Sequence, residues 1–118
     1  MIFSRELTDK VMSGEKVMTR RRMHRDGRAL RYKAGGVYAV QPGRGKPHVG
    51  HILVTHADTA PLWMLTIFDA RAEGFERIDD FWDYWMQLHG SLDIDELVTV
   101  IRFTLAPRCD RCPSAIQT

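Results

Sequence analysis

Nine residues near the start of the chain, Gly14 to Arg22, bring chemically active side chains into one short segment. They supply the amine of Lys16, the hydroxyl of Thr19 and three consecutive guanidinium groups. A threonine hydroxyl becomes nucleophilic when a neighbouring base accepts its proton, and a lysine is such a base when its pKa is lowered. Nearby arginines favour that lowering because positive charge disfavours the protonated amine. Lys16 and Thr19 are therefore candidate catalytic residues.

The spacing of this pair sets a structural condition. Lys16 and Thr19 are three residues apart, so a regular strand would point their side chains to opposite faces. The backbone must therefore bend between them if they act together. A carboxylate is also needed to orient the amine or to relay protons, and the best candidate is Glu73, just before Gly74 at the end of a short predicted helix. The alternative interpretation of Glu73 is an exposed carboxylate at a helix end.

The same segment is also a candidate anion-binding site. Forked guanidinium groups match the geometry of phosphate, and a nucleic-acid backbone offers a row of phosphates. The alternative is a solvated basic strand, as many charge runs are. The candidate nucleic-acid contacts in this segment and in the loops after it are Arg20, Arg21, Arg22, Arg25, Arg28, Arg44 and Lys46.

Charge is distributed unevenly along the chain, although the net charge is only +2. Lys and Arg outnumber Asp and Glu by 10 to 4 in residues 1–33, whereas acids outnumber bases by 10 to 5 in residues 66–118. Such an asymmetry can steer a polyanion to one face of the protein. It is equally consistent with two complementary faces that pack together.

The composition indicates a single globular domain. The chain has 118 residues, of which 44% are hydrophobic and 27% charged. No apolar run approaches the roughly 20 residues of a membrane helix, and residues 1–6 lack the pattern of a signal peptide. We therefore expect a cytoplasmic protein with no membrane partner and no obvious protein partner.

The two cysteines, Cys109 and Cys112, form a Cys-x-x-Cys motif near the end of the sequence. This is half of a zinc site, and His48 and His51 could in principle supply the other two ligands. A redox dithiol is a second option, but such pairs usually open a helix after a strand. The favoured interpretation is a plain tail, so we expect no metal and no cofactor.

Turn and cap residues divide the chain into short elements. Ser4 and Gly14 bound a predicted helix over residues 5–13, and a strand over residues 16–23 follows it. The remaining predicted elements are a loop at 24–31, a strand at 35–40, a turn at 41–47, a returning strand at 48–56, a strand or edge at 62–65, a helix from Thr66 to Gly74, a helix from Ile78 to Gly90 and a strand at 98–105.

The predicted helix that ends at Gly90 carries two tryptophans on its apolar face. Trp82 and Trp85 could stack on nucleic-acid bases, but packing in the core is the favoured interpretation. The order of elements does not alternate strand and helix, which disfavours a doubly wound parallel sheet. We therefore predict an α+β fold, a small and mostly antiparallel barrel or curved sheet over residues 1–106, followed by a tail at 107–118.

The order of these motifs resembles the ASCH domain of the PUA-like superfamily. The resemblance rests on Gly14-Glu15-Lys16-x-x-Thr19-x-Arg21, a Gly-Val strand at 36–37, Ala72-Glu73-Gly74-Phe75, the aromatic helix, and the final strand Val98-x-Val100-Ile101-x-Phe103. It implies a PUA-like β-barrel of about five to six strands with two to three short helices packed beside it. It also implies a cleft where the lysine-containing motif meets the glutamate-bearing helix.

The resemblance also implies what the site does. The family is generally associated with RNA or other nucleic acid, and one bacterial branch removes the acetyl group of acetylated cytidine with a lysine, a threonine and a glutamate. Those residues fall on Lys16, Thr19 and Glu73, and the arginine of the motif falls on Arg21. Other members are reported as ribonucleases.

Four functions follow from these observations. The first is nucleic-acid binding, RNA rather than DNA being favoured, in which a basic cleft grips a strand or a modified base and Tyr32, Tyr38 or Phe75 stacks on the base. The second is an amidohydrolase acting on acetylated cytidine. The third is a metal-independent ribonuclease in which Lys16 and the arginines stabilise the developing charge. The fourth is a domain that binds only other proteins.

Overall fold

The structure is a computed structural model that describes residues 1–106. The predicted tail at 107–118, with Cys109 and Cys112, lies outside the described residues. Four strands form one antiparallel sheet in the order β1-β4-β3-β2. They are β1 (Met18–Arg22), β2 (Val37–Val40), β3 (Gly50–Pro61) and β4 (Leu97–Leu105).

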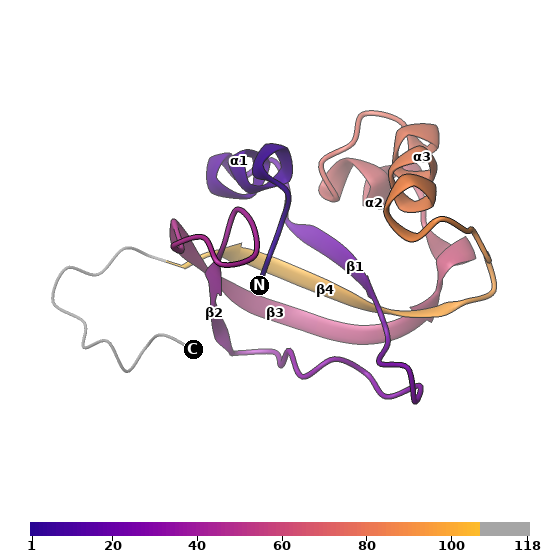
Figure 1. The fold of residues 1–118 in the computed structure, drawn as a ribbon, viewed down its shortest axis with the longest axis horizontal. Helices are drawn as coiled ribbons and strands as arrows, with labels where there is room; N and C mark the ends of the chain where they lie inside the picture. The colour runs from indigo at the N-terminus through magenta and orange to yellow at the C-terminus, as the bar shows by residue number, and fades with distance from the viewer. Residues whose placement is uncertain (107–118) are drawn as a thin grey trace, which may run out of the picture.

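The sheet is strongly curved, and β3 and β4 form its long centre (Figure 1). Its edges are β1 and β2, so the four strands make an open half-barrel rather than a closed one. A register shift between Val54 and His56 marks a bulge in β3, and bulges increase the local twist of a strand. The α+β architecture is confirmed, whereas the expected five to six strands are not, because residues 1–106 form only four.

The helices α1 (Arg5–Ser13), α2 (Ile67–Ala72) and α3 (Ile78–His89) lie on one side of the sheet (Figure 1). Local signals define their ends as predicted. The Ser4 hydroxyl accepts a hydrogen bond from the Leu7 amide at 3.2 Å, and Thr66 forms a reciprocal capping box with Asp69. Gly14 and Gly90 end α1 and α3 with φ angles of 85° and 74°, which glycine adopts without steric cost.

One predicted element is wrong. Residues 62–65 were expected to form a strand or an edge, but Leu62–Met64 is a single 3₁₀ turn. The strand before it is longer than predicted, because β3 pairs with β4 as far as Pro61, opposite Leu97. Several residues in this part of β3 are polar, so the sequence shows no alternation of apolar residues there. Pairing with β4 keeps these residues in a strand. The first strand also differs from its predicted range, because β1 begins at Met18 instead of Lys16.

The core has two parts. The first packs Phe3 and α1 against the sheet, with Val11, Ile52 and Val54 fully buried. The second packs α2 and α3 over the other end of the sheet around Phe81 and Trp85. Trp85 is 1% exposed, which confirms that this tryptophan belongs to the core. Within the described part of the chain, no helix is long and apolar enough to cross a membrane.

Candidate functional site

The end of α2 covers the open edge of β1, and this contact creates the site. Val17, just before β1, donates its amide hydrogen to the Ala72 carbonyl at 2.8 Å. The amide of Arg20 donates to Glu73 Oε1 at 3.3 Å. Glu73 is only 2% exposed, so the interpretation of this residue as an exposed helix-end carboxylate is wrong. Its side chain instead satisfies a backbone donor of an edge strand.

Lys16 joins the same junction from the other side. Its Nζ donates to the carbonyls of Met18 at 2.8 Å and Glu73 at 2.7 Å, and to Glu73 Oε1 at 3.4 Å. These acceptors match the three protons of an ammonium group. A cation at the C-terminal end of a helix is also favoured by the helix dipole. The amine therefore holds β1 to the end of α2.

Gly74 allows Lys16 to approach this closely. Its φ angle of +100° lies in the region that other residues rarely adopt. A Cβ at this position would lie 3.2 Å from Lys10 Cδ and 3.6 Å from Lys16 Cβ. The amine of Lys10 donates to the Gly74 carbonyl at 2.6 Å. Two lysines thus bind successive carbonyls where α2 ends.

Arg20 completes the junction and corrects a prediction. Its guanidinium contacts Glu73 Oε2 at 2.9 Å and Asp69 Oδ2 at 3.2 Å, and its side chain is 3% exposed. It cannot contact phosphate from this position, because both carboxylates already pair with it and solvent is excluded. We call Lys16, Arg20, Asp69 and Glu73 the buried cluster.

Burial lowers the pKa of the Lys16 amine from its ordinary value of 10.5 to about 8. Desolvation is the main cause, because it penalises the charged form. Glu73 opposes the shift through its charge and its hydrogen bond, while Arg21 and Arg20 add to it by repulsion. The predicted lowering of this pKa is thus present, but burial contributes more than the arginines do.

Thr19 and Arg21 occupy the other face of β1, as strand alternation requires. Thr19 is 4% exposed, and its Oγ1 accepts a hydrogen bond from Arg21 Nε at 3.2 Å. The Arg21 guanidinium also donates to the Ile2 carbonyl at 2.7 Å and lies 4.9 Å from the centroid of the Phe3 ring. Burial lowers the pKa of Arg21. Arg21 therefore positions the hydroxyl of Thr19 and packs on an aromatic ring.

Lys16 and Thr19 are close in the sequence, but no hydrogen bond joins their side chains in the described part of the protein. Lys16 lies two residues before Met18, the first residue of β1, so strand alternation does not fix the direction of its side chain relative to Thr19. Among the described residues, Lys16 Nζ nevertheless binds the carbonyls and the Glu73 carboxylate rather than the Thr19 hydroxyl. Joint chemistry would require the amine to exchange one of these contacts.

The other predicted anion contacts lie at the surface. Arg22 forms a bidentate pair with Glu96, at 2.8 and 3.0 Å. Arg28 pairs with Asp26 at 2.6 Å, and both side chains are more than half exposed. Arg25, Arg44 and Lys46 are also exposed. The predicted cations therefore divide into buried, paired and accessible groups.

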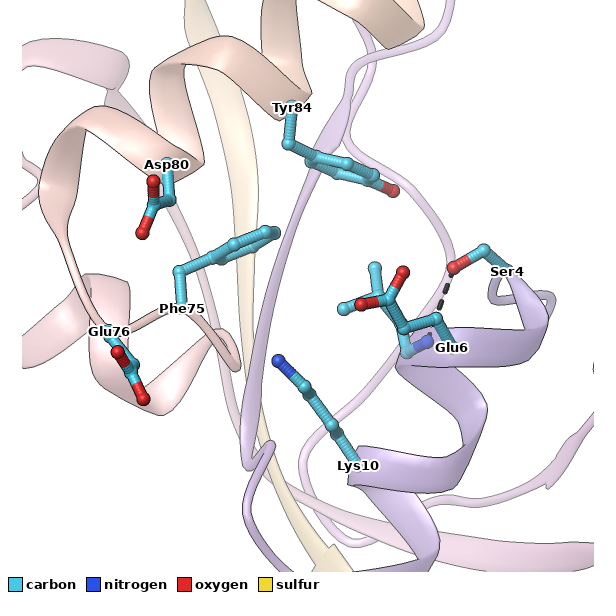
Figure 2. A pocket seen from close by; sticks show the side chains of 8 residues that line it. Ser4, Glu6, Lys10, Phe75, Glu76, Asp80 and Tyr84 are labelled. Carbon is cyan, nitrogen blue, oxygen red and sulfur yellow. Dashed lines mark hydrogen bonds between the residues drawn. The ribbon is translucent and has the colours of Figure 1, made fainter.

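A groove of about 350 Å³ opens between α1 and α3. Figure 2 shows the rings of Phe75 and Tyr84 projecting into it from the α3 side, with Lys10 reaching in from α1. Its other charged lining residues are the carboxylates Glu6, Glu76 and Asp80. None of Lys16, Thr19 and Glu73 lines this groove, whose rim carries three carboxylates and one amine.

The candidate stacking residues are largely engaged with one another. Tyr32 and Tyr38 meet edge to face with centroids 4.9 Å apart, and the Tyr38 hydroxyl accepts a hydrogen bond from the Lys33 amide at 2.9 Å. Phe75 packs on Tyr84 at 5.3 Å. Of the three candidates, Phe75 lines the groove, whereas Tyr32 lines a smaller hollow of about 280 Å³ with Thr59 and Thr99.

The sequence did not single out three residues of the site. The ring of Phe3 lies next to both Lys16 and Arg21. Asp69 forms ion pairs with Arg20 and, at 3.5 Å, with Arg102. The charges of Arg21 and Glu73 act on the hydroxyl of Tyr84. Burial raises the pKa of the Tyr84 hydroxyl. The sequence pointed to Asp69 only as a member of the capping box. No motif in the sequence connects Phe3 or Tyr84 with the segment that contains Lys16.

Comparisons with known proteins agree with this fold. The sequence matches no protein-family model and no curated protein. The structure is similar to an ASCH domain from Lactobacillus crispatus, at 18% identity and a TM-score of 0.63, over 85% of this chain and 70% of that one. A protein from Enterococcus faecalis gives 21% identity and a TM-score of 0.65, over 87% and 71% of the two chains.

A mutant of an ASCH protein from Zymomonas mobilis gives 16% identity and a TM-score of 0.61. That alignment covers 88% of this chain and 66% of the other, so these neighbours are longer than the part that this chain matches. The chain therefore has the fold of ASCH domains, as the resemblance in its sequence predicted.

Proposed function

We propose that this ASCH-fold domain binds single-stranded nucleic acid, with RNA favoured over DNA, through the cations of residues 23–49. We call these residues the basic segment. They comprise the loop before β2, β2 itself and the turn after it. The observation that carries the proposal is the exposed and nearly unopposed positive charge of this segment.

The basic segment contains six cations and one acid, Asp26. All six cations are exposed: Arg25, Arg28, Arg31, Lys33, Arg44 and Lys46. Four precede β2 and two follow it, so they lie beyond opposite ends of a strand of four residues, about 13 Å long. A few nucleotides of extended strand can therefore contact both loops, which matches the short site sizes of single-strand binders.

The negative charge of the protein is concentrated outside the basic segment, and its position favours a polyanion that is bound at the basic segment. Residues 74–96 contain seven acids and one base, Arg77. They include the helix α3 and the rim of the groove between α1 and α3. A polyanion is repelled from this region and attracted to the basic segment, so the charge asymmetry orients the ligand as well as attracting it.

The test is the salt dependence of binding, measured by fluorescence anisotropy with a labelled single-stranded RNA. If all six cations contact phosphate, log K should fall against log salt with a slope of about −4, at about −0.7 per contact. Replacing Arg44 and Lys46 together with Ala should make the slope shallower by about 1.4. The matched control is Arg77→Ala, an exposed arginine at the start of α3, which should leave affinity and slope unchanged.

Binding that does not depend on salt would contradict this proposal, as would an equal loss in Arg77→Ala. Single-stranded DNA of the same sequence and a duplex RNA form the other two arms of the experiment. A preference for the duplex would contradict single-strand binding, and equal affinity for DNA would remove the preference for RNA.

A second candidate function is hydrolysis of an amide on a nucleoside, as in acetylated cytidine. The buried Lys16, with a pKa of about 8, favours it because such an amine is partly neutral near physiological pH. Thr19 Oγ would attack the amide carbonyl while Lys16 accepts its proton. The C–N bond would then break, the amine would leave with that proton, and water would release the acyl group from Thr19.

This reaction makes a demand on the structure. Lys16 must exchange a carbonyl contact for Thr19 when substrate binds, and Glu73 must then hold the amine in place. Incubation with acetylated cytidine tests it through release of acetate. Turnover should be lost in Thr19→Ala, whereas RNA affinity in the same variant should stay within about twofold because Thr19 is buried and carries no charge. Unchanged turnover in Thr19→Ala would exclude this mechanism.

A further inference from the structure

The groove between α1 and α3 has an aromatic wall. The rings of Phe75 and Tyr84 have centroids 5.3 Å apart and planes inclined at 41°, and both side chains are half-buried. Figure 2 shows the two rings side by side in the groove. The face of an aromatic ring attracts an organic cation, and its apolar surface covers the methylene groups of such a ligand. An aliphatic ammonium compound therefore fits this wall.

Three carboxylates surround the aromatic wall. Glu6 belongs to α1, whereas Glu76 and Asp80 belong to the loop before α3 and to the first turn of α3 (Figure 2). All three side chains are exposed. Among residues 1–106, none of the three forms an ion pair, so their charges are available to a ligand that lies between the two helices.

Lys10 shows which chemical group the groove accepts. Its amine donates to the Gly74 carbonyl at 2.6 Å and lies 5.9 Å from the centroid of the Phe75 ring. This separation is within the range of about 6 Å over which a ring attracts a cation. The groove thus already holds one primary ammonium group beside an aromatic ring. Three carboxylates against one amine leave two negative charges, which two further ammonium groups would balance.

The charge around the groove selects the same class of ligand. Residues 74–96 contain seven acids and one base, so the local field attracts cations and repels nucleotides and other anions. A bare divalent metal ion fits less well, because no group of three or more possible metal ligands occurs within residues 1–106. An organic cation needs no such group, since its charges are spread along a chain.

We propose that the groove between α1 and α3 binds an aliphatic polyamine. Its methylene chain lies against Phe75 and Tyr84, and its ammonium groups lie beside the carboxylates of the two walls. This inference goes beyond the proposed function, because none of the residues that line the groove belongs to the basic segment and the ligand has the opposite charge.

The test is isothermal titration calorimetry of the full chain with putrescine, at low ionic strength because salt screens exposed charges. Putrescine should bind with a stoichiometry of one per chain. The neutral compound of the same length, 1,4-butanediol, should bind at least about tenfold more weakly because it lacks the two charges. MgCl₂ has the same charge but gains nothing from the rings, so it should also bind at least about tenfold more weakly.

Two variants test the two kinds of contact. The double variant Glu6→Gln with Asp80→Asn removes one exposed carboxylate from each wall and should weaken putrescine binding about fivefold or more. The matched control is Asp83→Asn with Asp95→Asn, which changes the net charge equally outside the groove and should alter affinity by less than about twofold. Tyr84→Leu removes a ring and should weaken binding about two- to fivefold. Far-ultraviolet circular dichroism checks that each variant is folded.

Four results would overturn the proposal. The first is an absence of saturable putrescine binding to the wild-type protein. The second is equal affinity for putrescine and for Mg²⁺, because the groove would then attract any divalent cation. The third is an equal loss in the two double variants, because only the overall charge of the protein would then matter. The fourth is unchanged affinity in a folded Tyr84→Leu variant, because the aromatic wall would then not contact the ligand.

Discussion

The buried cluster and the basic segment both concentrate cations, but the protein treats the two groups in opposite ways. In the buried cluster, Lys16 and Arg20 are almost fully buried and share the Glu73 carboxylate. In the basic segment, six exposed cations face a single acid. Buried charges must be paired, whereas exposed ones keep their affinity for a partner. The comparison teaches that neighbouring arginines of one motif can differ in their environment, since Arg20 is buried against Glu73 whereas Arg22 forms an exposed pair with Glu96.

The largest expected difference between the two regions is in stability. Glu73→Gln removes the carboxylate that compensates two buried cations, and breaking such a pair costs about 3–5 kcal/mol. Glu96→Gln breaks the exposed pair with Arg22 and should cost about 1 kcal/mol or less. Urea unfolding of both variants measures the contrast. Equal losses would show that the buried cluster contributes no more than a surface pair.

Backbone geometry offers a smaller contrast. Gly74 and Gly45 both have positive φ angles, but only Gly74 has side-chain atoms where a Cβ would lie. Gly45→Ala should cost about 1–2 kcal/mol from the left-handed conformation alone. Gly74→Ala should cost more, because the stem of Lys10 must move away from the new methyl group. Denaturation midpoints of the two variants test this order, and a reversed order would contradict the close packing around Gly74.

The pH dependence of stability should report Lys16 directly. Its folded pKa of about 8 lies below its ordinary value of 10.5. The unfolded chain therefore binds more protons between these values, and stability should rise as the pH increases from about 8 to about 10.5. Lys16→Met should remove this component, which urea unfolding across the range measures as the difference between the two proteins. A parallel pH dependence in both would mean that the amine is not desolvated.

The smallest effects should come from the basic segment. Arg25→Ala and Lys46→Ala remove exposed side chains that form no ion pair within residues 1–106, so each should change stability by less than about 0.5 kcal/mol. Thermal unfolding measures this. A loss above 1 kcal/mol in either variant would mean that these cations stabilise the fold and are not free for a ligand.

Local chemistry explains which parts of the fold could be predicted from the sequence. The caps at Ser4 and Thr66 and the glycine at the end of α3 act within a few residues, so their signals are visible in the chain itself. The strand β4 was also predictable, since its β-branched residues are consecutive. The end of β3 was not, because only its pairing with β4 maintains it.

The geometry around Lys16 could not be predicted from the sequence. Lys16 and Glu73 form an ion pair while Thr19 bonds to Arg21, and the burial of Glu73 depends on how α2 packs against the edge of β1. The sequence could not separate Arg20 from Arg21 either. Strand alternation sends one to the carboxylates and the other to Thr19 and Phe3, and the register of β1 is fixed only by its pairing with β4.

Hydrogen exchange with and without bound single-stranded RNA tests the central claim most directly. Amides of residues 23–49 should become more protected when RNA binds, while those of α2 and α3 should keep their exchange rates. Protection at the acidic residues 74–96, with no change in the basic segment, would contradict the account.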